Sequence, residues 1–255
     1  MKPGLRFALL LPVTALAGCA VNNPGSTTSS IQSGQPTNWE VQWTNSFPPL
    51  AIAATGELQI NSSQATGTFT SIALPCIPSA TENFTGTIDA SGNLTLDARF
   101  ITLQLLDVAS GNTVLSGTLT GGGYLCQAGM SGPIIATEIA PLNGTYTGTL
   151  TASTESDSGQ ATLSVTQSTT PNADGSFSLG GTLTFPPSSG LGTYPLSGTI
   201  SGEGITVYDP TPGIVPVVSL TASTNPAATQ ITVSDLAFAV TASDIVTFTG
   251  TLTSQ

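Results

Sequence analysis

Residues 146–150 read Tyr-Thr-Gly-Thr-Leu, and residues 248–252 read Phe-Thr-Gly-Thr-Leu. This pattern is a large apolar residue, any residue, glycine, threonine, and then leucine or isoleucine. It occurs at Phe84–Ile88, Leu115–Leu119, Tyr146–Leu150, Leu179–Leu183, Leu196–Ile200 and Phe248–Leu252. Because side chains alternate between the two faces of a strand, the apolar residues and the glycine share one face. A glycine in that row permits close backbone approach or a sharp bend, so the pattern predicts curved strands in a closed or strongly coiled sheet.

Two-residue alternation of apolar and polar side chains continues outside this pattern. Residues 84–88 and 94–100 alternate on either side of Asp89-Ala90-Ser91-Gly92-Asn93, which predicts a β-hairpin with a glycine- and asparagine-containing turn. Turn residues recur at intervals of roughly 8–12 residues, and no window has a helical period. We therefore expect an all-β fold of antiparallel meander, barrel-like or sandwich modules.

The chain divides into two halves of ordinary domain size. Residues 38–140 contain both tryptophans and a cysteine pair, and their pattern predicts six or seven strands. Residues 141–255 predict about eight strands, and matching patterns near both ends would let the first and last strands meet. Two tandem β modules are the leading interpretation. A single two-sheet domain of some fourteen strands is the alternative.

The first residues have the features of an export signal. Two basic residues, Lys2 and Arg6, precede an apolar run of about ten residues, which is half the length that spans a bilayer. The run ends in Leu16-Ala17-Gly18-Cys19. This tetrapeptide resembles the lipobox of bacterial lipoproteins, and the resemblance covers residues 1–19. The alternative is an ordinary secretory leader with an incidental cysteine.

The resemblance implies a location and an anchor. Residues 1–18 would be removed as a signal peptide, and Cys19 would carry a thioether-linked diacylglycerol and usually an amide-linked acyl chain such as palmitate. Position 20 is alanine, which favours the outer membrane under the sorting rule of many bacteria with two membranes. Residues 19–37 would then be a lipidated cysteine and a flexible linker, with an r.m.s. span of roughly 20–25 Å. We expect a cell-envelope protein held to the membrane by its N-terminal lipid, facing the periplasm or the exterior.

Charge and composition exclude several kinds of chemistry. Downstream of Cys19 the chain has one basic side chain, Arg99, against 14 acidic ones, and it contains no lysine and no histidine. Nucleic-acid binding needs clusters of basic residues and is therefore not expected. Without histidine and lysine, the Ser-His-Asp triad, the usual zinc sites and Schiff-base chemistry are also unavailable. We predict no enzymatic activity, no cofactor and no bound metal.

The remaining cysteines, Cys76 and Cys126, form an even pair in an oxidising compartment. A structural disulfide is the expected outcome, and closing a loop of about 50 residues would stabilise the fold by roughly 4 kcal/mol. A redox-active pair is disfavoured because the two residues do not form a Cys-x-x-Cys motif.

Carboxylates are the only groups that could act in catalysis. The pairs nearest in sequence are Glu155 with Asp157 and Glu203 with Asp209. A carboxylate-dependent glycosidase would need two such acids about 5–10 Å apart in a cleft. Both pairs also fit solvated turns, which is the interpretation we favour.

Two turns and a pair of tryptophans each allow both a structural and a ligand-binding interpretation. Asp89–Asn93 and Asn172–Gly175 offer oxygen ligands for calcium, yet their residue types form turns without a metal. Trp39 and Trp43 would share one face of a strand, where core packing is the leading interpretation and a floor for a sugar or an apolar ligand is the alternative.

The leading functional hypothesis is a non-catalytic structural or interaction module of the envelope, whose partner is an unidentified envelope protein. The alternative is a lipocalin-like carrier, in which a barrel encloses a small apolar ligand in a cavity of a few hundred cubic ångströms. A porin-like barrel is disfavoured, because aromatic residues make up only 6% of the chain.

Overall fold

The computed structural model describes residues 34–44, 52–72, 80–99, 101–121, 130–153, 158–211, 217–241 and 244–255. Within these ranges the chain forms sixteen antiparallel β-strands and two short 3-10 turns, η2 (Val108–Ser110) and η3 (Pro187–Ser189). This part of the chain contains no helix with the length and hydropathy needed to cross a membrane. The predicted all-β, antiparallel fold is confirmed.

The first eight strands pair in chain order and form a closed barrel, which we call barrel 1. Its strands are β1 (Thr37–Trp43), β2 (Ile52–Asn61), β3 (Gln64–Ser71), β4 (Thr81–Ile88), β5 (Leu94–Asp97), β6 (Ile101–Leu105), β7 (Val114–Gly121) and β8 (Met130–Ile139). Pairing of β1 with β8 closes the barrel, and Trp39 lies opposite Glu138 in that ladder. The sequence pattern predicted six or seven strands here, and the structure has eight.

The next eight strands form a second closed barrel, barrel 2. Its strands are β9 (Gly144–Ala152), β10 (Ser158–Pro171), β11 (Phe177–Thr184), β12 (Thr193–Ser201), β13 (Gly204–Tyr208), β14 (Val217–Thr224), β15 (Gln230–Thr241) and β16 (Asp244–Ser254). Its first and last strands pair, with Leu150 opposite Gly250 and Gly148 opposite Leu252. The two copies of the repeated pattern that were expected to meet are therefore paired side by side.

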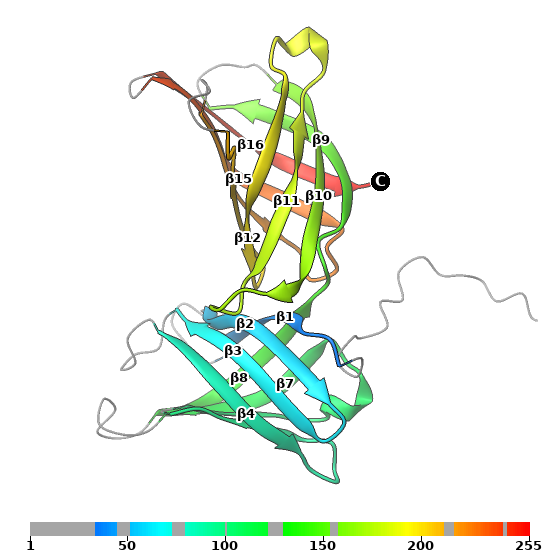
Figure 1. The fold of residues 1–255 in the computed structure, drawn as a ribbon, viewed down its shortest axis with the longest axis vertical. Coiled ribbons are helices and arrows are strands. Elements are labelled where there is room, and N and C mark those ends of the chain that lie inside the picture. The colour runs from blue at the N-terminus through cyan, green and yellow to red at the C-terminus, as the bar shows by residue number, and fades with distance from the viewer. Residues whose placement is uncertain are drawn as a thin grey trace, which may run out of the picture.

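The two barrels follow one another along the chain and are stacked in space (Figure 1). Residues 140–143 connect β8 to β9, and the predicted change of module at 140/141 lies within this connection. One end of barrel 2 rests on the outer wall formed by β1 and β2. The structure therefore has two closed barrels, and neither the expected sandwich nor the alternative single domain of some fourteen strands is formed.

Glycines of the repeated pattern lie where neighbouring strands approach most closely. A Cβ atom added to Gly148 or Gly181 would collide with a backbone carbonyl oxygen of the adjacent strand, that of Thr251 or Ser164 respectively. The same collision would occur at Gly86, Gly117, Gly198 and Gly250. The predicted reason for the pattern, close backbone approach in a strongly coiled sheet, is confirmed.

Each of these glycines also faces a large side chain across the ladder. Gly181 lies opposite Val165, and Gly198 lies opposite Val207. The corresponding pairs elsewhere are Gly86 with Leu96, Gly117 with Leu105, Gly148 with Leu252 and Gly250 with Leu150. Side chains directly opposite in an antiparallel ladder share one face, so each glycine leaves room for its apolar partner in a narrow interior.

Apolar side chains fill both barrels. In barrel 1 the rings of Phe69 and Phe84 meet edge to face at 5.6 Å. In barrel 2 the ring of Phe238 contacts those of Phe185, Tyr194 and Phe248 at 5.3–5.7 Å. Such contacts stabilise a core by about 0.5–1.5 kcal/mol each beyond burial of area.

The adjacent glycines Gly180 and Gly181 provide a test of this account. Gly181→Ala should lower the free energy of unfolding by about 2 kcal/mol or more, because the new methyl group meets the Ser164 carbonyl. Gly180→Ala should leave stability unchanged or raise it by about 0.4–1 kcal/mol, because nothing lies within 4 Å of the new methyl group. Urea denaturation of both variants gives the comparison, and equal destabilisation by the two substitutions would contradict it.

Candidate functional site

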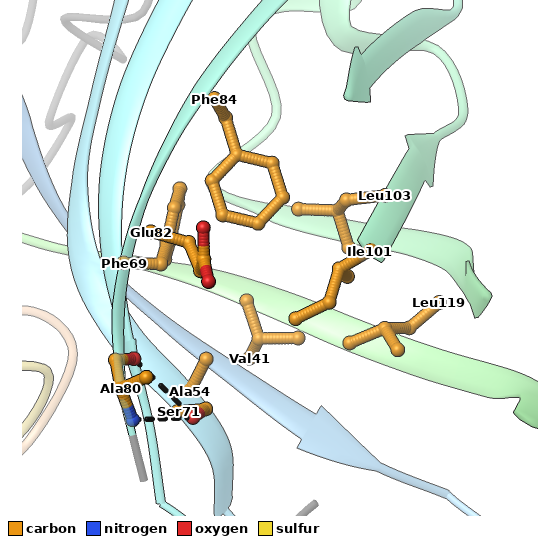
Figure 2. A pocket seen from close by; sticks show the side chains of 10 residues that line it. All are labelled: Val41, Ala54, Phe69, Ser71, Ala80, Glu82, Phe84, Ile101, Leu103 and Leu119. Carbon is orange, nitrogen blue, oxygen red and sulfur yellow. Dashed lines mark hydrogen bonds between the residues drawn. The ribbon is translucent and has the colours of Figure 1, made fainter. Parts of the chain in front are cut away.

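Among the described residues of barrel 1, a small hollow lies in the interior, at the end where β3 and β4 are joined. It is lined by Val41, Ala54, Phe69, Ser71, Ala80, Glu82, Phe84, Ile101, Leu103 and Leu119 (Figure 2). The Glu82 carboxylate points into this apolar surround. The cavity volume is about 20 Å³. A single water molecule needs roughly 10–15 Å³, so the hollow has room for about one.

Barrel 2 is at least as tightly filled. A hollow among its described core residues, lined by Leu142, Leu163 and Val207 among others, has a volume of about 10 Å³. A carrier of the lipocalin type would need a cavity of roughly 300–1,000 Å³. The hollows among the described residues of the two interiors are far smaller than that.

The carboxylate pair Glu203 and Asp209 is not brought together. Glu203 lies in the turn before β13 and Asp209 follows that strand, so the two acids lie at opposite ends of barrel 2. A strand rises about 3.3 Å per residue, which separates them by roughly 20 Å. This distance is well beyond the 5–10 Å that a glycosidase pair requires.

Several predicted residues lie outside the described part of the chain. They are Cys19, Cys76, Cys126, Glu155 and Asp157. The strands before the two cysteines, β3 and β7, run in the same direction around barrel 1, so both strands finish at the same end of it. The disulfide and the lipidation stay predictions.

The Asp89 turn is closed by its own side chain. Asp89 Oδ1 accepts hydrogen bonds from the backbone N–H groups of Ser91 and Asn93, at 2.8 and 2.9 Å. The hydrogen bond from the Asn93 backbone is the main reason that the pKa of Asp89 lies below its usual value. The carboxylate thus shapes the predicted hairpin turn between β4 and β5.

The turn between β10 and β11 has the same construction. Asp174 Oδ1 accepts hydrogen bonds from the hydroxyl and the backbone N–H of Ser176, which lower the pKa of Asp174. Among the described residues there is no group of three or more acidic, histidine or cysteine side chains placed to bind a metal ion.

Both tryptophans belong to the core of barrel 1. Trp39 and Trp43 face inward from β1 and are 1% and 9% exposed. The indole N–H of Trp39 donates to Thr37 Oγ1 at 2.7 Å, and the ring of Trp43 occupies the space beside Gly132. Burial leaves no face of either ring free to form the floor of a sugar site.

A cluster of long-range polar contacts lies at the joint between the barrels. Asn38, buried on the outer wall of β1, donates from Nδ2 to the Gly202 carbonyl and accepts from the Gly202 N–H, both at 2.8 Å. Beside it, the hydroxyls of Thr55 and Ser201 are 2.8 Å apart. These contacts join segments that are some 150 residues apart in the sequence.

Two further hydrogen bonds belong to the joint and involve additional segments of both barrels. The Ala140 N–H donates to the Pro226 carbonyl at 2.8 Å, and the Thr70 hydroxyl donates to the Asp174 carbonyl at 3.1 Å. Three turns of barrel 2, those before β11, β13 and β15, therefore contact barrel 1 or its connection. The sequence did not predict this joint, because nothing in the residues around Asn38 or Gly202 indicates that the two segments contact each other.

Carboxylates from both barrels meet in this joint. Glu40 is 2% exposed, accepts from Gln42 Nε2 at 2.6 Å, and accepts from the backbone N–H of Glu203 at 3.1 Å. Burial raises the pKa of Glu203, and the neighbouring Glu40 carboxylate raises it further. Burial also raises the pKa of Glu57 on β2, although hydrogen bonds from Thr68 oppose the shift. Glu203 was predicted to be a solvated turn residue. It does lie in a turn, but that turn contacts barrel 1.

A cleft of about 170 Å³ lies beside these contacts. It is lined by the segment entering β1, the connection between the barrels, and the adjoining ends of β10 and β11; its residues are Gln35, Pro36, Thr37, Asn38, Ile139, Pro141, Asn143, Gln167, Ser168, Thr169 and Phe177. Ligand sites often form where two domains meet, which makes this cleft the leading candidate site.

Comparison with known proteins returned neither a matching family model nor a matching curated protein.

The raised pKa of Glu203 predicts a pH-dependent stability. The folded state binds a proton at Glu203 more tightly than the unfolded chain does, so this group makes the protein less stable as pH rises above the ordinary value of 4.5 through the raised pKa. Glu203→Gln removes the charge and should stabilise the protein at about pH 7, by less than about 1 kcal/mol for a partly solvated group. The difference from wild type should shrink towards about pH 4. Denaturation at both pH values measures it, and a difference independent of pH would contradict the assignment.

Proposed function

We propose that this protein is a lipid-anchored, non-catalytic module of a bacterial cell envelope, in which two filled barrels form a rigid body beyond a short tether. The filled interiors carry the proposal. Proteins that use a β-barrel to carry a ligand keep a cavity inside it, whereas the described interiors here hold space for about one water molecule each. What the barrels offer to a partner is therefore their outer surface and the joint between them.

The placement of the carboxylates supports a non-catalytic role. Asp89 and Asp174 organise turns, while Glu40 and Glu203 lie in the joint between the barrels. Glu203 and Asp209 are separated by the length of β13. None of these carboxylates is among the residues that line the cleft beside the joint, where a glycosidase would need a pair of acids.

The outer wall of barrel 2 supports an extracytoplasmic interaction role. Across the ladder that closes the barrel, Thr149 lies opposite Thr251 and Thr151 lies opposite Thr249, and all four are exposed. Rows of uncharged hydroxyl groups keep this surface hydrated. They contribute no basic groups, which would bind anionic lipids or nucleic acid. In this proposal the acyl chains at Cys19 hold the protein to the membrane; two such chains suffice for stable anchoring.

Substitution of Cys19 tests the proposal. Cys19→Ala should move the protein from the membrane fraction to the soluble fraction, because the acyl chains are lost. Mass spectrometry of the wild-type protein should show residues 19–255 with a diacylglycerol-sized addition at Cys19. Cys76→Ala is the matched control and should stay in the membrane fraction. A wild-type protein without added lipid mass, or a Cys19→Ala variant that stays with the membrane, would overturn the anchor.

A further inference from the structure

The cleft between the barrels has apolar walls and a neutral lining. Pro36, Ile139, Pro141 and Phe177 supply the apolar surface, and none of the described residues that line the cleft is titratable. The volume of about 170 Å³ is close to that of an engineered cavity of about 150 Å³ that binds benzene. The cleft therefore has room for a small group of a few non-hydrogen atoms.

Gln167 brings an unused donor to this cleft. The residue is 7% exposed, and its Oε1 atom accepts a hydrogen bond from the Leu142 N–H at 2.9 Å. A backbone N–H can only donate, so this contact fixes which end of the amide is oxygen and turns the Nε2 group away from Leu142. Nε2 has no hydrogen-bond partner among the described residues, and it is not sealed from solvent.

Asn143 repeats this arrangement from the connection. Its Oδ1 atom accepts from the Gln167 backbone N–H at 2.9 Å, which fixes its orientation in the same way. Its Nδ2 group also has no hydrogen-bond partner among the described residues. The Thr169 hydroxyl lines the same cleft and can accept as well as donate.

We propose that this cleft binds a neutral N-acyl amide group, such as an acetamido group. Its carbonyl oxygen, with two lone pairs, accepts from Gln167 Nε2 and Asn143 Nδ2. Its N–H donates to the Thr169 hydroxyl, and its methyl group lies against the proline and phenylalanine walls. Gln167 is 7% exposed, so its Nε2 group has little access to water, and a ligand that supplies the acceptor gains affinity.

The neutral lining determines the class of ligand. An anion would meet the field of the nearby Glu40 and Glu203 carboxylates, and a cation would find no carboxylate among the described residues that line the cleft. A purely apolar ligand would leave the amide donors unsatisfied. The acyl amide could belong to an N-acetylated amino sugar or to a peptide. This inference concerns the folded barrels and does not depend on the lipid anchor.

Nuclear magnetic resonance tests the proposal directly, because side-chain amide groups give their own signals. The ¹⁵N-labelled full-length protein would be titrated with N-acetylglucosamine and, separately, with N-acetylalanine amide. Glucose, which has no amide, is the control. We expect the side-chain signals of Gln167 and Asn143 to shift and saturate with at least one acetylated probe and not with glucose; which probe acts identifies the source.

Two isosteric variants keep the backbone contacts and remove the donors. In Gln167→Glu and Asn143→Asp a carboxylate oxygen still accepts from the Leu142 or Gln167 N–H, while the amide nitrogen is replaced by an acceptor. Binding should weaken about tenfold or more in each, read from the signal of the other residue. Gln160→Glu adds the same charge to β10 on an exposed residue outside the cleft, and binding should not change.

Three results would overturn the proposal. They are no shift with either acetylated probe, an equal shift with glucose, or unchanged binding in folded Asn143→Asp. Asn143 is exposed, so its variant should fold even if the buried charge in Gln167→Glu prevents folding.

Discussion

Close backbone approach at the inward-facing glycines is the constraint on which both barrels depend. At Gly148, Gly181 and their equivalents, the neighbouring carbonyl oxygen occupies the space of a Cβ atom. This contact lets the strands coil tightly, and a tightly coiled sheet of eight strands closes around a narrow interior. The same glycines make room for the opposing leucine or valine, so coiling and filling of the core have one cause.

The described interiors contain little free space, so the walls, the ends and the joint are the surfaces that the described residues offer to a partner. Here the wall of β1 and β2 is already used, because Asn38 and Glu40 bind the Gly202–Glu203 turn of barrel 2. The joint positions the two barrels, places carboxylates from both in one region, and leaves a neutral cleft beside them. The inter-barrel hydrogen bonds, the raised pKa of Glu203 and the neutral cleft thus lie together in the joint.

Local patterns were sufficient to predict much of the fold. The repeated pattern indicated inward glycines and a coiled sheet, and its copies near residues 148 and 250 indicated that the first and last strands of barrel 2 pair. The hairpin at Asp89 followed from turn-forming residues between two alternating segments. These inferences succeeded because strand alternation and turn chemistry are properties of short segments.

The joint and its cleft could not be predicted in this way. Asn38 is a polar residue at the start of a strand and Gly202 is one turn glycine among several; only the closed barrels bring them together. Gln167 continues the inward row of β10, so its pattern indicates core, but its amide group reaches the end of the barrel and the cleft. Glu203 was placed in the correct turn with the wrong surroundings for the same reason.

Amide hydrogen exchange along β9 and β16 tests closure of the coiled sheet most directly. In an antiparallel strand, alternate N–H groups point to the two neighbouring strands. A closed barrel protects both alternating sets in β9 and in β16, because each strand has a partner on either side. We predict slow exchange at every amide of the β9–β16 ladder, comparable to that of the β10–β11 ladder. Fast exchange at every second residue of both strands would show an open sheet edge and contradict the account.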